Sequence, residues 1–126
     1  MIVNSQVTFF YYDDMAKAAD FYENVMNFPV VQDQGFAKIY RAGRTFFGIV
    51  DGKTGSLRPQ EQNAVMLTLL VDNVMEWHEH LVAHGVKVRS MPNKEGFAEA
   101  GLYYDPGGYV FEIQHFNNPL EHAVFE

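Results

Sequence analysis

The sequence predicts an α+β fold made of two βαβββ modules, and two observations carry this prediction. A strand-like apolar run, an Asp or Asn cap and an amphipathic helix occur in this order twice, over residues 7–27 and over residues 65–85. Each helix is followed by short runs rich in β-branched and aromatic residues, with turn residues between them. One half is too small to bury a sheet face, so two halves, from one chain or from two, must close over each other.

The first module is expected over residues 6–51. Val7–Tyr12 is a strand that is apolar on both faces, and Asp13-Asp14 supplies candidate N-caps for the helix after it. The helix should end near Asn27, which tolerates a left-handed conformation, because Pro29 cannot continue it. Three short strands complete the module, over residues 30–31, 36–41 and 44–50.

The second module is expected over residues 64–116, after a polar linker with Gly and Pro at residues 52–63. Its strand Val65–Val71 leads into a helix that begins at Asp72-Asn73 and ends at Gly85. The remaining elements are expected as a strand at 86–88, a loop over 91–101, a strand at 102–104, a turn at 105–108 and a last strand at 109–116. The tail, residues 117–126, either crosses to a partner subunit or is loose.

Composition excludes several kinds of partner. With 126 residues and nearly half of them apolar, the chain is expected to be a single globular domain. The formal charge of −7 argues against nucleic acid and against an anionic membrane surface. The chain has no Cys, no apolar run long enough to span a membrane and no basic start typical of a signal peptide. We therefore expect a soluble cytoplasmic protein.

Glu112 is the most informative residue, because it interrupts an otherwise apolar strand. Alternation places Val110, Glu112 and Gln114 on one face of that strand and Phe111 and Ile113 on the other. A carboxylate in such surroundings is costly unless something pairs with it. Either this is an edge strand with Glu112 in water, or it is a cavity wall with Glu112 directed at a ligand.

Three motifs resemble those of the vicinal oxygen chelate superfamily, which includes glyoxalase I, bleomycin-resistance proteins and extradiol dioxygenases. They are Asp14 followed by Phe21-Tyr22, then Val71-Asp-Asn73, then Asp105-Pro-Gly-Gly-Tyr-Val-Phe-Glu112. The resemblance covers residues 7–116. It implies that the paired βαβββ modules form incompletely closed sheets around a pocket, and that the chain is a homodimer.

The resemblance also implies where a metal would be bound, in the first and last strands of each module. Glu112 suits such a position, whereas Val7, Met66 and Phe47 at the other positions are not metal ligands. A bulge that turned Gln6 inward would still leave the site short of three ligands. We therefore expect no metal and no other cofactor, with a divalent metal as the alternative.

Other clusters of polar residues carry weaker signals. His80 and His84 are spaced to chelate a metal on the second helix, with His78 nearby, but a solvated helix face is the favoured explanation because no third ligand of fixed spacing accompanies them. The sequence contains neither a phosphate-binding loop nor a nucleophile elbow.

The pocket is expected to be apolar and aromatic, with Glu112 as its acidic group. Alternation gives the inward residues, with the last two at the rim: Val7, Phe9, Tyr11, Phe47, Met66, Thr68, Leu70, Val110, Gln114, Phe97 and Tyr104. A planar ligand that is cationic or donates hydrogen bonds would suit this site.

The leading hypothesis is a protein without a metal that binds or sequesters a small aromatic or amphipathic molecule, as bleomycin-resistance proteins do. The alternatives are a metal-dependent lyase or dioxygenase of the glyoxalase type, a metal-free enzyme with Glu112 as catalytic general base, and a purely structural role.

Overall fold

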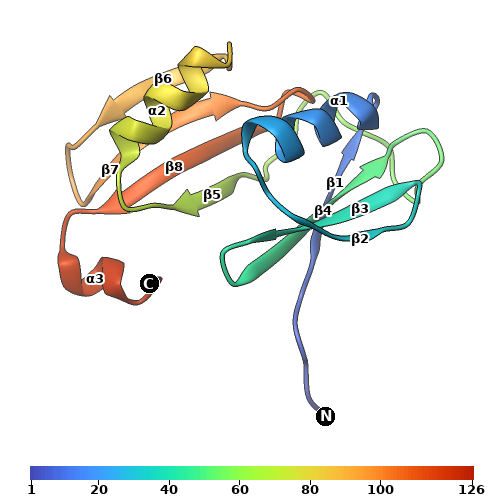
Figure 1. Ribbon diagram of the computed structural model, residues 1–126, viewed down its shortest axis with the longest axis horizontal. Helices are drawn as coiled ribbons and strands as arrows, with labels where there is room; N and C mark the ends of the chain where they lie inside the picture. Colours follow the sequence, from blue (N-terminus) through green and yellow to red (C-terminus); the bar gives the residue numbers. More distant parts are fainter. The chain divides into compact units, whose positions relative to one another are not determined.

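The computed structural model describes residues 1–126, which form two compact units, Met1–Gln62 and Asn63–Glu126 (Figure 1). Each unit contains one four-stranded sheet, with strand order β1-β4-β3-β2 in the first and β5-β8-β7-β6 in the second. In each sheet the first strand runs parallel to the last, and the other neighbours are antiparallel. Neither sheet closes on itself, so the predicted α+β class with two open βαβββ modules is confirmed.

The first unit follows the predicted order of elements. In chain order these are β1 (Thr8–Tyr12), α1 (Met15–Asp20), η1 (Phe21–Val25), β2 (Val30–Asp33), β3 (Ala37–Ala42) and β4 (Thr45–Asp51). The side chain of Asp14 caps α1 by accepting a hydrogen bond from the backbone N–H of Lys17 at 3.1 Å. Asn27 ends the helical segment with a φ of 57°, which confirms the predicted left-handed residue.

The second helical segment of this unit, η1, is a π-helical turn, which the sequence did not predict. The Met26 N–H donates at 3.0 Å to the carbonyl of Phe21, five residues earlier, whereas an α-helical N–H donates to the residue four earlier. Both aromatic residues that begin this turn, Phe21 and Tyr22, are buried. Tyr22 packs edge-on against Phe47, with 4.9 Å between the ring centres.

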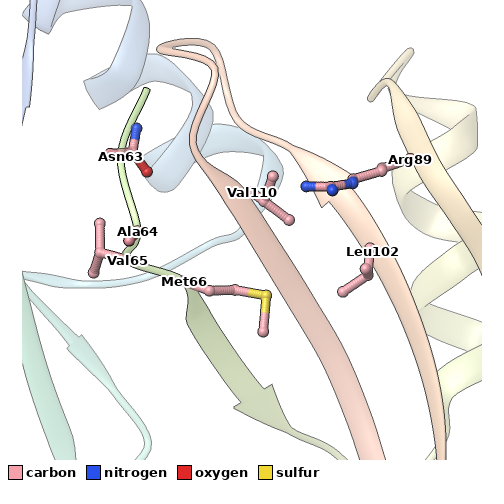
Figure 2. Close-up of a pocket in the computed structure, with 7 residues that line it drawn as sticks. All are labelled: Asn63, Ala64, Val65, Met66, Arg89, Leu102 and Val110. Carbon is pink, nitrogen blue, oxygen red and sulfur yellow. The ribbon is translucent and has the colours of Figure 1, made fainter. Parts of the chain in front are cut away.

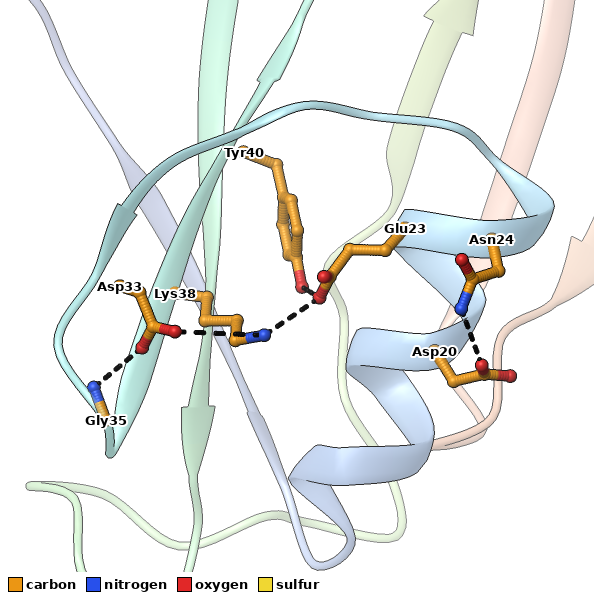
Figure 3. A network of polar contacts seen from close by, with 7 residues as sticks. All are labelled: Asp20, Glu23, Asn24, Asp33, Gly35, Lys38 and Tyr40. Carbon is orange, nitrogen blue, oxygen red and sulfur yellow. Dashed lines mark hydrogen bonds and ion pairs between the residues drawn. The ribbon is translucent and has the colours of Figure 1, made fainter.

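A polar network ties η1 to β3 on the helix-covered side of the first sheet (Figure 3). The Tyr40 hydroxyl donates to Glu23 Oε2 at 2.8 Å, and Lys38 Nζ lies 3.1 Å from the same oxygen. Burial raises the pKa of Tyr40, and the hydrogen bond to Glu23 raises it further. Because these groups satisfy one another, the buried hydroxyl of Tyr40 costs little.

The second unit also has a helix on one face of its sheet (Figure 1). Its elements are β5 (Leu67–Leu70), α2 (Val74–Ala83), β6 (Val88–Asn93), β7 (Ala98–Tyr104), β8 (Val110–Phe116) and α3 (Pro119–Ala123). The core joins α2 to the sheet, and its fully buried members are Val74, Leu81, Tyr103, Phe111 and Ile113. Asn73 caps α2, as its sequence position predicts.

The prediction of a loop over residues 91–101 is wrong. Strand β6 extends to Asn93 and β7 begins at Ala98, so only residues 94–97 lie between them. The composition of this region misleads because β6 is an edge strand, and an edge strand tolerates Pro92 and irregular pairing with β7.

The tail holds a short helix, α3, in contact with β8. His122 of this helix is buried, with 3% of its surface exposed, and its ring lies 3.9 Å from that of His115. The Phe116 N–H donates to His122 Nδ1 at 3.3 Å. The tail is therefore docked on its own unit.

Candidate functional site on the open face of the second sheet

The two faces of the second sheet differ sharply in their surroundings. On β8, Phe111 and Ile113 are buried on the side of α2, whereas Val110, Glu112 and Gln114 are only half-buried on the other side. We call this other side the open face of the second unit. The alternation that the sequence predicted for this strand is therefore present, with the carboxylate on the open face.

Glu112 lies in the middle of this open face. Strand β8 lies between β5 and β7, where Glu112 pairs with Thr68 on one side and Leu102 on the other. The edge-strand explanation for Glu112 is therefore wrong. Thr68 Oγ1 donates to Glu112 Oε1 at 2.9 Å, and the second carboxylate oxygen accepts no hydrogen bond. This oxygen can accept a hydrogen bond or a proton from a bound molecule.

A hollow of about 310 Å³ lies on the same unit (Figure 2). Its lining combines apolar side chains, one amide and one cation: Asn63, Ala64, Val65, Met66, Arg89, Leu102 and Val110. Val110 stands two residues before Glu112 on β8, and Leu102 is the cross-strand partner of Glu112 on β7. Figure 2 shows the guanidinium of Arg89 extending from β6 toward Val110.

Several predicted site residues gather on this open face. Met66 and Val110 line the hollow, Thr68 holds Glu112, and Gln114 follows on the same face of β8. The ring of Tyr104 lies under Lys87, with 5.0 Å from Nζ to the ring centre.

Phe97 was expected at the rim of the pocket, but it lies away from the hollow. It is 69% exposed and stacks on Phe116, with 6.1 Å between ring centres. Because Ala98 pairs with Phe116 at the far end of the β7–β8 ladder, Phe97 is separated from Val110 by nearly the whole length of β8.

The structure divides the predicted site residues of the first unit between two faces. Alternation along β1 places Phe9 and Tyr11 on one face, and Gly48 is the partner of Phe9 on β4. Phe47 pairs with Thr8, so it lies on the other face, which is covered by the helix. Phe47 is 2% exposed and packs among Phe10, Tyr22, Phe28 and Tyr40. The expectation that Phe47 lines the pocket is therefore corrected. Val7 lies just before β1 and is exposed.

Strand register corrects one of the positions at which a metal of the superfamily type would be bound. Thr68 pairs with Glu112, and it stands five residues before the N-cap Asn73. The residue five before the other N-cap, Asp14, is Phe9, and its partner is Gly48. Gly48, rather than Phe47, is therefore the counterpart of Glu112, and a Cβ atom added there would clash with the Phe9 ring. With Val7 and Met66 at the first-strand positions, Glu112 is the one ligand-type side chain of the set, which does not fit a catalytic divalent metal.

A second group of ligand-type residues surrounds His122. Atoms of Asp72, His122 and Glu126 lie within 4.8 Å of one another, and His122 Nε2 is 4.0 Å from Asp72 Oδ1. Because the Phe116 N–H donates to Nδ1, the neutral ring carries its proton on Nε2 and turns that proton toward Asp72. The ring therefore offers a donor there instead of a lone pair, and the group anchors α3.

The histidines in and next to α2 do not form a metal site. His78 faces the core, where Nδ1 lies 2.9 Å from the Tyr103 hydroxyl. His84 Nδ1 donates to the His80 carbonyl at 2.8 Å, and the two rings lie 4.3 Å apart. No third ligand-type side chain joins the pair His80 and His84.

Two open βαβββ modules are the architecture of the vicinal oxygen chelate superfamily. Residues 5–113 match the family described as the Glyoxalase/Bleomycin resistance protein/Dioxygenase superfamily, and the chain belongs to this superfamily. This is the family indicated by the motifs around Asp14, Asp72 and Glu112.

Solved structures agree on the fold. A lactoylglutathione lyase from Agrobacterium tumefaciens is 21% identical, with a TM-score of 0.72 and coverage of 87% of this chain and 91% of that one. A genomically encoded fosfomycin resistance protein from Listeria monocytogenes is 21% identical, with a TM-score of 0.75 and coverage of 97% and 98%. A glyoxalase/bleomycin resistance protein/dioxygenase family enzyme from Burkholderia phytofirmans is 16% identical, with a TM-score of 0.77 and coverage of 87% and 96%.

Comparison with curated proteins gave no match. None of the helices combines the length and the apolar character that crossing a membrane requires.

Proposed function

We propose that this protein binds a small aromatic or amphipathic organic molecule in the hollow of its second unit, without a metal. The observation that carries the proposal is Glu112, a half-buried carboxylate with one oxygen held by Thr68 and the other without a hydrogen bond. Met66, Leu102 and Val110 form apolar walls of the hollow, and Leu102 is the cross-strand partner of Glu112. An apolar pocket with a few placed polar groups is the usual make-up of a small-molecule site.

Sequestration of a small molecule, without metal-dependent catalysis, is the function that the side chains at the metal-ligand positions support best. The positions that correspond to the other metal ligands hold Val7, Gly48 and Met66, so the alternative of a metal-dependent lyase or dioxygenase lacks its ligands. Resistance to small molecules occurs among proteins of this fold, as the names bleomycin resistance and fosfomycin resistance show. Metal analysis of the purified protein tests this point, and a stoichiometric divalent metal that is lost in Glu112→Ala would contradict it.

The binding proposal is tested by filling the hollow. Val110→Trp places a large ring in the lining, and Val82→Trp places the same ring on the exposed side of α2 as a matched control. Aromatic and aliphatic compounds that raise the melting temperature of the wild type should lose at least about tenfold in affinity with Val110→Trp, because the ring displaces them. Binding by Val110→Trp equal to that of the control would reject the site.

A second candidate, a metal-free enzyme with Glu112 as general base, is favoured by one observation. The unbonded carboxylate oxygen of Glu112 is available to take a proton from a bound molecule. Glu112→Gln keeps the shape of the side chain, so it should retain binding and abolish turnover if the protein is such an enzyme. Unchanged turnover in this variant would exclude the general-base role.

A further inference from the structure

Arg89 is the one charged side chain among the residues that line the hollow. Strand β6 carries it at the edge of the sheet, and its guanidinium extends over the apolar lining toward Val110 (Figure 2). Lys87 stands two residues earlier, and its ammonium lies over the ring of Tyr104. The β6 edge of the open face therefore carries positive charge, while its centre carries Glu112.

The guanidinium of this cation has no partner within the protein. Residues 63–126 contain nine acidic and only three basic residues, Lys87, Arg89 and Lys94, and none of the three makes an ion pair. The side chain of Arg89, which is exposed, also makes no hydrogen bond. A guanidinium without a protein partner beside an apolar wall attracts an anion that brings apolar surface with it.

We infer that the hollow takes an amphipathic organic acid whose carboxylate pairs with Arg89. The inference rests on the proposed function, because it names the ligand class of the same hollow. The apolar body of the acid packs on Met66, Leu102 and Val110. The planar guanidinium donates two parallel hydrogen bonds to the carboxylate, a geometry that an ammonium cannot match.

Glu112 fixes the direction in which such a ligand lies. Its negative charge repels a carboxylate, so the acid group lies toward β6 and the rest of the molecule toward β8. A hydroxyl or amine at that other end of the ligand can donate to the unbonded oxygen of Glu112. The two charged residues thus define opposite ends of one ligand.

The test uses three probes that share one apolar body: phenylbutyrate, phenylbutanol and phenylbutylamine. Each is titrated at neutral pH into the full-length protein labelled with nitrogen-15, and the backbone amide signals of the lining residues report binding. The acid should bind about tenfold more tightly than the alcohol. Arg89→Gln should remove this difference, and Arg89→Lys should keep only part of it.

Lys94→Gln is the matched control, because it removes the same charge from the same unit outside the lining. It should leave both affinities unchanged. Three results would overturn this inference and leave the proposed function standing. They are equal binding of the acid and the alcohol at the hollow, tightest binding of the amine, and equal effects of Arg89→Gln and Lys94→Gln on the affinity for the acid. Absence of binding by all three probes at the lining residues would overturn both proposals.

Discussion

The hydrogen bond between Thr68 and Glu112 joins β5 to β8 at the centre of the open face. Its acceptor is a carboxylate on a central strand, where an unpaired charge would be costly. The hydroxyl satisfies one oxygen and leaves the other for a ligand. The hydrogen bond between Thr68 and Glu112 therefore links two strands of the sheet and also positions the carboxylate of the proposed site.

Removing the hydroxyl of Thr68 should lower stability without changing the shape of the core. Thr68→Val is expected to reduce the free energy of unfolding by about 1 kcal/mol, because Glu112 loses its partner on a half-buried face. Urea denaturation measures this loss. A double-mutant cycle with Glu112→Gln isolates the pair, and a coupling energy near zero would show that the bond contributes nothing.

Buried tyrosines predict a loss of stability at high pH. Burial raises the pKa of Tyr103 from 10.0 to about 12, and the pKa of Tyr40 is raised in the same direction. Since the folded pKa lies above the unfolded value, this stability is complete below pH 10 and is lost as the pH rises through 12.

Denaturation curves between pH 9 and pH 12 measure this loss, over a window that follows from the pKa of about 12 for Tyr103. Tyr103→Phe has no group to ionise at this position, so its stability should fall less steeply over the same range. Identical slopes for the wild type and the variant would contradict the assignment.

At the scale of elements, α3 is held by a single buried side chain. His122 accepts the Phe116 N–H, stacks beside His115 and turns Nε2 toward Asp72. Most other side chains of α3 are exposed. Docking of this helix therefore depends on His122.

His122→Ala should release α3 from β8. The Phe116 amide loses its acceptor, so its hydrogen exchange should become faster, together with that of residues 117–126. Exchange measured by NMR or mass spectrometry tests this expectation, with His84→Ala, on the exposed end of α2, as the control. Unchanged protection in His122→Ala would show that other contacts hold the tail.

Element ends were predictable from the sequence where a side chain fixes the local backbone. Asp14 and Asn73 cap their helices by bonding the backbone, and Asn27 adopts the left-handed conformation. The π-turn was not predictable, because its hydrogen bonds depend on how Phe21 and Tyr22 pack against the sheet. The helix in the tail was missed although Asn118 and Pro119 form a helix-start signal, and only its docking through His122 depends on a tertiary contact.

The arrangement of the open face was only partly predictable. Alternation along β8 placed Glu112 correctly relative to Phe111, because both lie on one strand. Phe47 was misplaced because alternation within a strand does not give its register against a neighbour. Arg89 was missed because the assigned strand stopped at residue 88, although continuing the same alternation would have placed Lys87 and Arg89 on one face.

At the scale of the whole molecule, we propose that the two modules, near residues 6–51 and 64–116 with linker 52–63, form a single domain. In each unit the helical segment after the first strand covers one sheet face, and the second unit adds only the short α3 against β8, so the open face has little covering structure of its own. Fragments of residues 1–62 and 63–126 should therefore lack cooperative unfolding when expressed separately. Thermal denaturation followed by circular dichroism tests this, and two cooperative transitions would show independent domains.

We also propose that the chain forms a homodimer. The edge strand β2 exposes Val30 and Val31, and Phe36 beside it is also exposed. Exposed apolar residues on an edge strand favour association with another chain. Light scattering after size-exclusion chromatography should give twice the chain mass, and Val31→Lys should reduce it. A monomer at micromolar concentration would contradict this proposal.

The close packing of the Phe9 ring over Gly48 limits how this protein can change. Exchange of Gly48 for Glu alone drives the new side chain into the ring of Phe9. An acidic side chain at this counterpart of Glu112 therefore needs a smaller residue at position 9, which gives protein engineers a defined pair of positions to alter together.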